Sequence, residues 1–311
     1  MTAEPDLGPE SGMLARLAAS RAGRLGIQIL RWGIPLVLLV IIGHRLTALG
    51  WSEIWTARPV HPGFYILLVL QFFLQPFGDF LVYRNLWGRA NTPPMKVILR
   101  KRLMNTFMLD YSGEAFFYFW AQAKLKLAPG MLVHGIKDSN VLSGGAGLLM
   151  VYLMLLALLA LGGLHVPATL NTHGWLYALA GSVPLILCVV LFLGRRKLTQ
   201  HSTGQIVTTF FIHFTRSALV LAVEFGLWAL SGALPSALAC LQFVALRLVV
   251  TRLPLVPNKD LIFLGAGIAA AGMANMSVTP VATVLVILAA ADLILAASVA
   301  SFAWLLDRKD R

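Results

Sequence analysis

The sequence predicts an all-α integral membrane protein of about eight helices, with one or two re-entrant hairpins and both termini in the cytoplasm. Composition is the first observation behind this prediction, since 58% of the 311 residues are hydrophobic and 12% are charged, whereas soluble domains carry about 25% charged residues. The second is a series of long apolar runs, and the third is the clustering of Lys and Arg in alternate loops. The composition excludes an ordinary soluble enzyme, a disordered protein and a disulfide scaffold.

The apolar runs predict one polytopic membrane domain over residues 32–306, with a cytoplasmic amphipathic segment over 1–31 and a cytoplasmic tail over 307–311. The polar, acidic start argues against a cleavable signal peptide. Residues 14–31 mix Leu and Ile with Arg, which suits either an interfacial helix or a positive flank of the first span. Each crossing needs about 20 apolar residues. The runs cover residues 32–49, 62–83, 103–123, 139–163, 174–194, 208–230, 235–250, 260–274 and 280–306.

The basic residues predict the orientation, because loops rich in Lys and Arg stay in the cytoplasm. Nineteen of the 25 basic residues fall in segments that we assign to the cytoplasm, while Arg45 and Arg58 fall on the opposite side. We interpret the net charge of +12 as an attraction to anionic lipid headgroups and not to nucleic acid. The cytoplasmic segments are 16–31, 84–102, 124–137, 195–197 and 308–311.

Segment 103–123 breaks this alternation. It is long enough to cross the membrane, yet both flanks are basic, and the later loop 164–173 has no Lys or Arg and belongs outside. The alternation is kept if 103–123 enters from the cytoplasm and returns as a re-entrant hairpin with a polar turn at Asp110–Glu114. Irregular backbone at that depth must be buried in protein or line a wet cavity. A cytoplasmic interfacial helix and an ordinary span are the alternatives.

The runs 235–250 and 260–274 raise a similar question. Both are short for a crossing, and they flank the polar sequence RLPLVPNKD, Arg252–Asp260. They form either two short spans around a cytoplasmic loop or a second hairpin that dips from the outer face. Paired interrupted segments often mark the substrate site of a transporter. The first break carries acidic residues and the second carries basic ones, so we expect the two breaks to be electrostatically complementary.

Acidic side chains inside apolar runs are the main candidates for a functional site, because a carboxylate at a helix centre costs roughly 2.5–3.5 kcal/mol. Polar residues recur every four positions from Gln71 to Tyr83 and form one stripe. Arg216 is a natural partner for a buried acid, whereas we expect a packing role for Asp292 in its Ala-rich run. The predicted substrate cavity comprises Gln75, Asp79, Asp110, Ser112, Gly113, Glu114, Arg216, Glu224, Arg247, Arg252 and Lys259.

Motifs for other chemistries are not found in the sequence. The seven histidines lack metal-ligand spacing, and SGGAG (Ser143–Gly147) lacks the Lys and Ser/Thr of a phosphate-binding loop, so we interpret it as a site of close helix approach. Cys188 and Cys240 lie inside apolar runs, where a structural bridge is not expected. We therefore predict no metal, no cofactor and no enzymatic activity.

A resemblance to a known family supports the hairpins. Basic residues Arg100–Arg102 lead into Asn105 and then Gly113–Glu114 before a second basic stretch. This pattern resembles the flippase-like membrane domain found at the amino end of lysylphosphatidylglycerol synthases and in stand-alone bacterial proteins. Over most of the chain, the resemblance implies about eight helices, re-entrant segments and movement of lipids between leaflets. The family's second signature, Pro-Gly-Gly-Leu-Gly followed by Glu, corresponds to Leu253–Asp260, where the glycines are replaced. No aminoacyl-transferase domain is expected, so lipid aminoacylation is not implied.

The sequence thus predicts a multi-pass protein of the bacterial inner (cytoplasmic) membrane. We expect it to move a phosphate-bearing or polyprenyl-type lipid between leaflets through a charged mid-membrane cavity. Two other functions stay open, an integral-membrane enzyme acting on a lipid headgroup and a non-catalytic subunit of a membrane complex. The expected partners are membrane lipids and anionic headgroups at the cytoplasmic face, with no nucleic acid, and a homo-oligomer is left open.

Overall fold

The computed structural model describes residues 50–107, 111–163, 199–252 and 259–309, together with positions 40, 43, 44, 47, 182 and 186. Within these residues the regular structure is entirely helical, which confirms the predicted class. The elements are α4 (Trp51–Thr56), α5 (Pro62–Trp87), the short 3-10 helix η2 (Arg89–Asn91), α6 (Met95–Phe107), α7 (Ser112–Lys124), α8 (Pro129–Ala160), α12 (Thr203–Ser231), α13 (Ala237–Thr251), α14 (Lys259–Met273) and α15 (Val278–Lys309). The apolar runs 32–49 and 174–194 lie largely outside the described residues.

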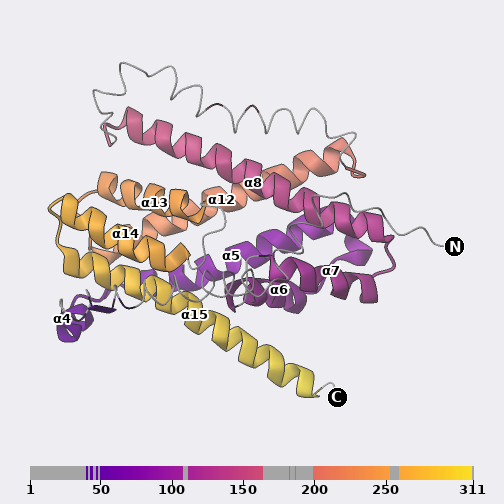
Figure 1. Cartoon of the computed structure of the whole chain (residues 1–311), viewed down its shortest axis with the longest axis horizontal. Coiled ribbons are helices and arrows are strands. Elements are labelled where there is room, and N and C mark those ends of the chain that lie inside the picture. The colour runs from indigo at the N-terminus through magenta and orange to yellow at the C-terminus, as the bar shows by residue number, and fades with distance from the viewer. Residues whose placement is uncertain are drawn as a thin grey trace, which may run out of the picture.

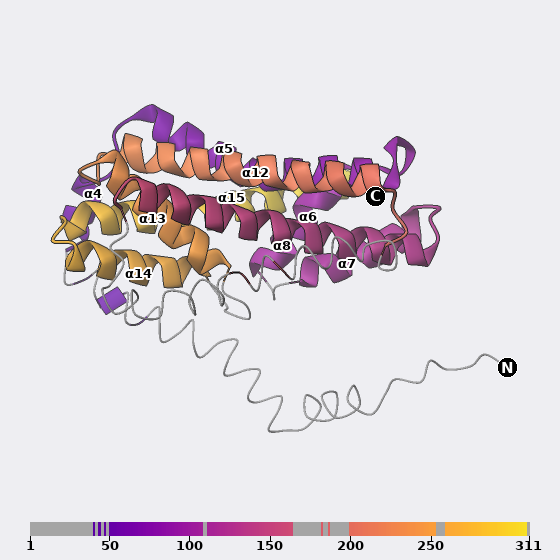
Figure 2. The same cartoon turned by 90° about the horizontal axis from the view of Figure 1, so that it is seen from above.

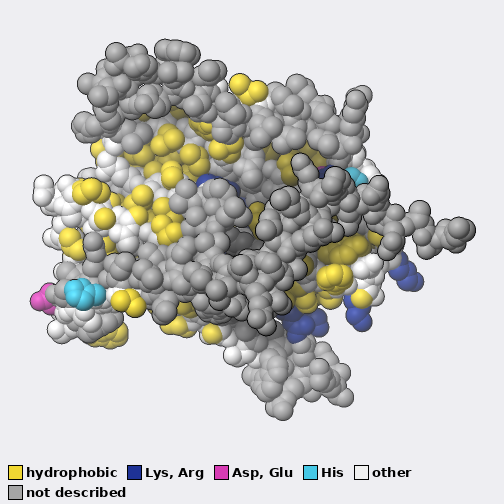
Figure 3. Space-filling view, in the orientation of Figure 1, with side chains coloured by type: hydrophobic (Ala, Val, Ile, Leu, Met, Phe, Trp, Pro, Cys, Tyr) yellow, Lys and Arg dark blue, Asp and Glu magenta, His cyan; other side chains and the backbone are white. Residues whose placement is uncertain are grey.

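Four described helices, α5, α8, α12 and α15, are long and apolar enough to cross a membrane. Helix α12 packs against both α5 and α8, and these three run along the long axis of the molecule (Figures 1 and 2). Large apolar side chains are exposed on the outer faces, among them Ile66, Phe77, Leu156 and Phe211. Figure 3 shows hydrophobic side chains over much of the described surface. These features indicate an α-helical membrane protein, because apolar patches of this extent are rare on soluble monomers.

Local sequence places the start of the long helices. The ring Nδ1 of His61 accepts a hydrogen bond from the Gly63 N–H at 3.1 Å at the start of α5. A capping box opens α12, because Ser202 Oγ accepts from the Gln205 N–H while the Gln205 side chain accepts from the Ser202 N–H. Helix α12 ends at Gly232, whose φ of +66° favours glycine. The polar residues in the middle of these helices are therefore held in a definite register.

The remaining helices include two pairs of short ones. Helices α6 and α7 have 13 residues each, and α13 and α14 have 15 each. At 1.5 Å per residue they are about 20 Å and 22 Å long, below the roughly 30 Å thickness of a bilayer core. Helix α6 packs against α7, and α13 packs against α14. Both views place the α6–α7 pair towards one end of the long axis and the α13–α14 pair towards the other (Figures 1 and 2).

Two large apolar clusters occupy these two ends. In the first, Tyr83, Trp87 and Phe117 join α5 to α7, with ring centroids 4.5 to 5.3 Å apart. In the second, Trp228 of α12 meets Phe243 of α13 with ring centroids 4.9 Å apart. Each short helix pair is therefore anchored through aromatic contacts to a long helix.

The first helix pair differs in two ways from the sequence prediction. Helix α6 ends at Phe107 and α7 begins at Ser112, so Ser112–Glu114 belong to a helix and not to the predicted turn. Asp110 lies outside the described residues. Helix α6 also begins at Met95, so Lys96 and Arg100–Arg102, which we assigned to a cytoplasmic loop, belong to this helix. Lys101 is only 5% exposed. The carboxylates of Asp79 and Glu114 pair with Lys101 and compensate for its burial. Counting charges along the sequence could not detect these partners.

Candidate functional site

A cavity of about 440 Å³ lies among α5, α6, α8, α12, α13, α14 and α15. Its wall includes Gln75 of α5, Ser143 of α8, Arg216 of α12 and Asp292 of α15, each near the midpoint of its helix. The short helices also contribute residues to the cavity wall, and these residues lie close to the break in each pair. The cavity therefore lies at the middle depth of the four helices that are long enough to span a membrane.

The cavity wall carries more positive than negative charge. Of its described residues, five are basic and two are acidic. The basic residues are Arg102, Arg216, Arg247, Arg252 and Lys259, and the acidic residues are Glu224 and Asp292. Such a surface attracts anions, and the attraction is strong where the surroundings are apolar.

Arg102 links α6 to α15 across the cavity wall. Its Nη2 donates to Asp292 Oδ1 at 2.7 Å and its Nη1 donates to Gln75 Oε1 at 3.1 Å. The guanidinium also lies 4.3 Å from the centroid of the Phe72 ring. We expected a packing role for Asp292, but in the structure it forms an ion pair with Arg102 on the cavity wall.

Asp79 is the centre of a second ion-pair cluster behind the wall. Its carboxylate accepts from Lys101 Nζ at 2.8 Å and from Arg216 Nη1 at 3.0 Å, so it joins α5 to α6 and α12. Arg216 Nη2 also donates to Ser143 Oγ of α8 at 3.0 Å. These four helices are fixed to one another through one carboxylate and one guanidinium. Such a cluster is stable only when each buried charge has its partner.

The polar residues at the start of α7 hold that helix to α6. Asn105 Oδ1 accepts from the Gly113 N–H at 2.7 Å, and Asn105 Nδ2 donates to Glu114 Oε2 at 2.9 Å. Glu114 Oε1 lies 3.4 Å from Lys101 Nζ, and Ser112 Oγ donates to the Met104 carbonyl at 2.9 Å. These residues therefore connect the two arms of the helix pair and do not line the cavity.

Arg247 connects the cavity wall to α14. Its Nη1 lies 3.5 Å from Glu224 Oε1, and its Nη2 donates to Asp260 Oδ1 at 3.3 Å. The Glu224 side chain is 3% exposed, while that of Asp260 is 51% exposed. Glu224 Oε1 and Arg247 Nη1 are both buried without a hydrogen-bond partner in the described structure. Glu224 and Arg247 therefore form a long ion pair beside the cavity.

Six of the predicted cavity residues line the cavity, namely Gln75, Arg216, Glu224, Arg247, Arg252 and Lys259. Asp79 lies behind the wall, and Ser112, Gly113 and Glu114 form the contact between α6 and α7. Sequence reasoning missed Arg102 and Asp292. The burial cost of Asp292 could have indicated a basic partner, but three consecutive basic residues concealed that Arg102 faces inward.

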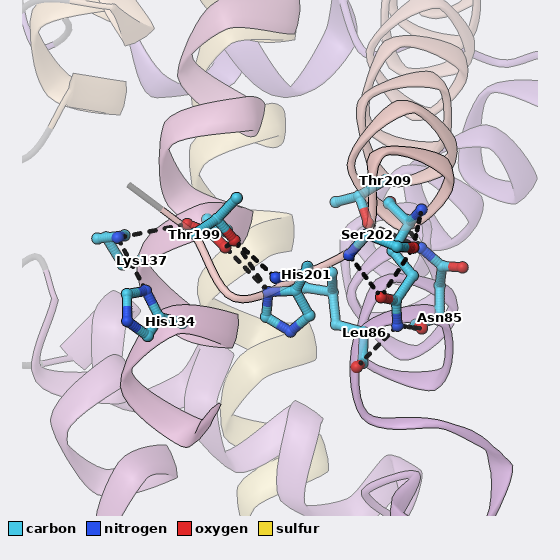
Figure 4. Close-up of polar contacts among 10 residues, drawn as sticks. Asn85, Leu86, His134, Lys137, Thr199, His201, Ser202 and Thr209 are labelled. Atoms are coloured by element: carbon cyan, nitrogen blue, oxygen red, sulfur yellow. Dashed lines mark hydrogen bonds and ion pairs between the residues drawn. The ribbon is translucent and has the colours of Figure 1, made fainter. Parts of the chain in front are cut away.

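A separate polar cluster joins the residues just before α12 to α8, and the first turn of α12 to α5 (Figure 4). His201 Nδ1 lies 2.9 Å from Asp138 Oδ2, and Thr199 Oγ1 donates to the same carboxylate. Nearby, Asn85 Nδ2 donates to the Gln205 carbonyl at 2.8 Å. All of these contacts join one segment of the chain to another. We assign this cluster a structural role.

Comparison of the chain with protein-family models, curated proteins and solved structures finds no match. The described residues also contain no group of His, Cys, Asp and Glu able to hold a metal ion. The cavity is therefore the feature of the described residues that bears most directly on function.

Proposed function

We propose that this protein moves a membrane lipid between leaflets, with the headgroup passing through the central cavity. The observation that carries the proposal is the basic cavity at the middle depth of four long apolar helices. Charged groups at that depth are costly, so membrane proteins retain them for pairing or for handling polar ligands. A lipid headgroup is the polar ligand that is always present at a membrane surface.

Two re-entrant hairpins are part of this proposal. Each of the four short helices is too short to span a bilayer core. Both pairs contribute residues near their breaks to the cavity, Arg102 from α6 and Arg252 with Lys259 from the second pair. Interrupted helices that meet at a mid-membrane site are typical of secondary transporters. The resemblance to the flippase-like membrane domain supports the same arrangement.

We place the α6–α7 end in the cytoplasm. Exposed basic residues gather there, including Arg84, Arg89, Lys96, Lys124 and Lys126, and Figure 3 shows Lys and Arg side chains on that side of the molecule. Cytoplasmic loops are enriched in Lys and Arg. The α6–α7 pair then enters from the cytoplasmic face and the α13–α14 pair enters from the opposite face.

The cavity size limits which part of the lipid enters. Ligand pockets range from about 300 to 1,000 Å³, and this cavity is near the lower end at about 440 Å³. The headgroup enters while the acyl chains stay in the bilayer. Arg247 shifts from Glu224 towards the headgroup as it passes. Because the sequence has no nucleotide-binding motif, the direction of movement depends on an ion gradient or on consumption of the lipid on one side.

The proposal is tested with purified protein in liposomes that contain a fluorescent phospholipid, with and without a pH gradient. An impermeant quencher then reports how fast inner-leaflet lipid reaches the outer leaflet. We expect movement well above that in empty liposomes and a loss of at least tenfold in Arg247→Gln. The control is Lys126→Gln, which removes an exposed cation outside the cavity. Movement equal to that in empty liposomes, or an Arg247→Gln rate equal to wild type, contradicts the proposal.

A further inference from the structure

Arg252 differs from the other guanidinium groups of the cavity. Arg102, Arg216 and Arg247 each lie within 3.5 Å of a carboxylate. Arg252, at the carboxyl end of α13, is exposed and lines the same cavity. Within the described part of the chain it has neither a carboxylate partner nor a hydrogen-bond acceptor. Arg216, a second guanidinium of the same charge, lines the same cavity.

The backbone of α8 provides a seat for Arg252. A Cβ atom on Gly147 would overlap the guanidinium carbon and both terminal nitrogens of Arg252. The guanidinium therefore lies directly against this glycine. Gly144, one turn away on the same helix, has no atom within 4 Å of its Cβ position. The close approach is thus a property of position 147 and not of the glycine-rich sequence as a whole.

Ser143 lies one turn before this seat and also lines the cavity. Its hydroxyl accepts a hydrogen bond from Arg216 Nη2 at 3.0 Å. Because a hydroxyl that accepts a bond retains its own proton for donation, Ser143 is able to donate to a ligand. Arg252, Arg216 and Ser143 come from three helices and present donors to one part of the cavity.

We propose that Arg252, seated on Gly147, forms with Ser143 a binding site for an oxyanion of the phosphate type. Two guanidinium groups of like charge are stabilised by an anion between them, and the planar fork of Arg matches the oxygen atoms of phosphate. Phosphate of a lipid headgroup and free inorganic phosphate have this chemistry in common. That a lipid supplies the phosphate depends on the proposed function, whereas the oxyanion site itself does not.

The test is equilibrium binding to the purified full-length protein in a non-ionic detergent. One arm uses inorganic phosphate, a second uses dihexanoyl phosphatidic acid, and a third uses dihexanoyl glycerol, which lacks the phosphate. We expect wild type and Gly144→Ala to bind at least one phosphate probe and not dihexanoyl glycerol. Arg252→Gln and Gly147→Ala should bind the same probe at least tenfold more weakly. Gly147→Ala retains every charge and only displaces the guanidinium, so it reports on the seat even if Arg252→Gln folds poorly.

The arms identify the source of the phosphate. Binding of inorganic phosphate indicates a free anion, whereas binding of the lipid probe alone indicates a headgroup. If wild type binds neither probe, or if Gly147→Ala binds as tightly as Gly144→Ala, the site does not exist. Arg252-dependent phosphate binding without lipid movement in liposomes retains the site and rejects the transport function. Lipid movement without such binding retains the transport function and rejects the site.

Discussion

The two short helix pairs differ in where they place their charges. In the α6–α7 pair, Glu114 and Lys101 face each other beside the break and are bound to Asn105 and Asp79. In the α13–α14 pair, the arms are joined by apolar contacts and by the Arg247–Asp260 bridge at 3.3 Å, and the basic residues near the break, Arg247, Arg252 and Lys259, line the cavity. The first pair thus uses its charges to hold its two helices together, whereas the second pair has basic groups on the cavity wall.

This difference shows that a charged residue at membrane depth does not by itself mark a substrate site. The sequence predicts the acidic residues of the first break and the basic residues of the second as complementary parts of one cavity. The contact partners separate them, because Glu114 is satisfied within its own helix pair while Arg252 has no carboxylate among the described residues. Substitutions in the first pair should therefore change stability, and substitutions in the second should change ligand handling.

The largest stability effect is expected for Asp79→Ala. The change leaves Lys101 and Arg216 buried without their shared carboxylate, and breaking such a buried pair costs about 3–5 kcal/mol. The free energy of unfolding in mixed micelles, followed by Trp fluorescence, measures the loss. Asp260→Ala is the control on the second pair, because that carboxylate is 51% exposed and should contribute about 1 kcal/mol or less. Equal losses in the two variants contradict the assignment of Asp79.

A smaller difference in stability is expected between the variants Gly113→Ala and Gly267→Ala. A Cβ on Gly113 would overlap the backbone carbonyl oxygen of Lys101, which cannot move without separating α6 from α7. A Cβ on Gly267 would lie 2.7 Å from a methyl carbon of Leu285, which is able to rotate. Overpacking costs about 1–3 kcal/mol. The loss in the free energy of unfolding should be larger for Gly113→Ala than for Gly267→Ala, and for Gly113→Ala it should reach or exceed that range.

Thermal unfolding of the two variants in detergent checks this order. Gly265→Ala is the control for helix propensity, because no atom lies within 4 Å of its Cβ position. It should be neutral or stabilising, by up to about 1 kcal/mol. A greater loss in Gly267→Ala than in Gly113→Ala contradicts the view that the first pair is the more rigidly held.

Much of this arrangement is already visible in the sequence. Apolar runs indicate the long helices, and the polar residues within 103–123 indicate that this segment is interrupted, as the separate helices α6 and α7 show. The Arg102–Asp292 pair was not predictable, because 190 positions separate the two residues and no local pattern brings α6 beside α15. The contact between Glu114 and Lys101 was not predictable for a related reason, because the sequence analysis assigns Lys101 to a cytoplasmic loop.

The smallest stability effect is expected for Arg252→Gln. Its guanidinium has no ion-pair partner among the described residues, so the change should alter the free energy of unfolding by no more than about 0.5 kcal/mol. Glu114→Gln should cost about 1–3 kcal/mol, because it weakens the bonds to Asn105 and Lys101 inside the first pair. Unfolding in mixed micelles compares the two, and a larger loss in Arg252→Gln would make that residue structural.

The most direct test of the account is the side of the membrane on which each helix pair begins and ends. Single cysteines at Arg89, Lys126 and Ala274, in a chain with Cys188 and Cys240 replaced by Ser, are labelled in intact cells and in inverted vesicles with an impermeant maleimide. The account predicts that Arg89 and Lys126 label from the cytoplasmic face and Ala274 from the opposite face. Labelling of Arg89 and Lys126 from opposite faces would mean that α6 and α7 cross the membrane, and the central cavity could not be built as proposed.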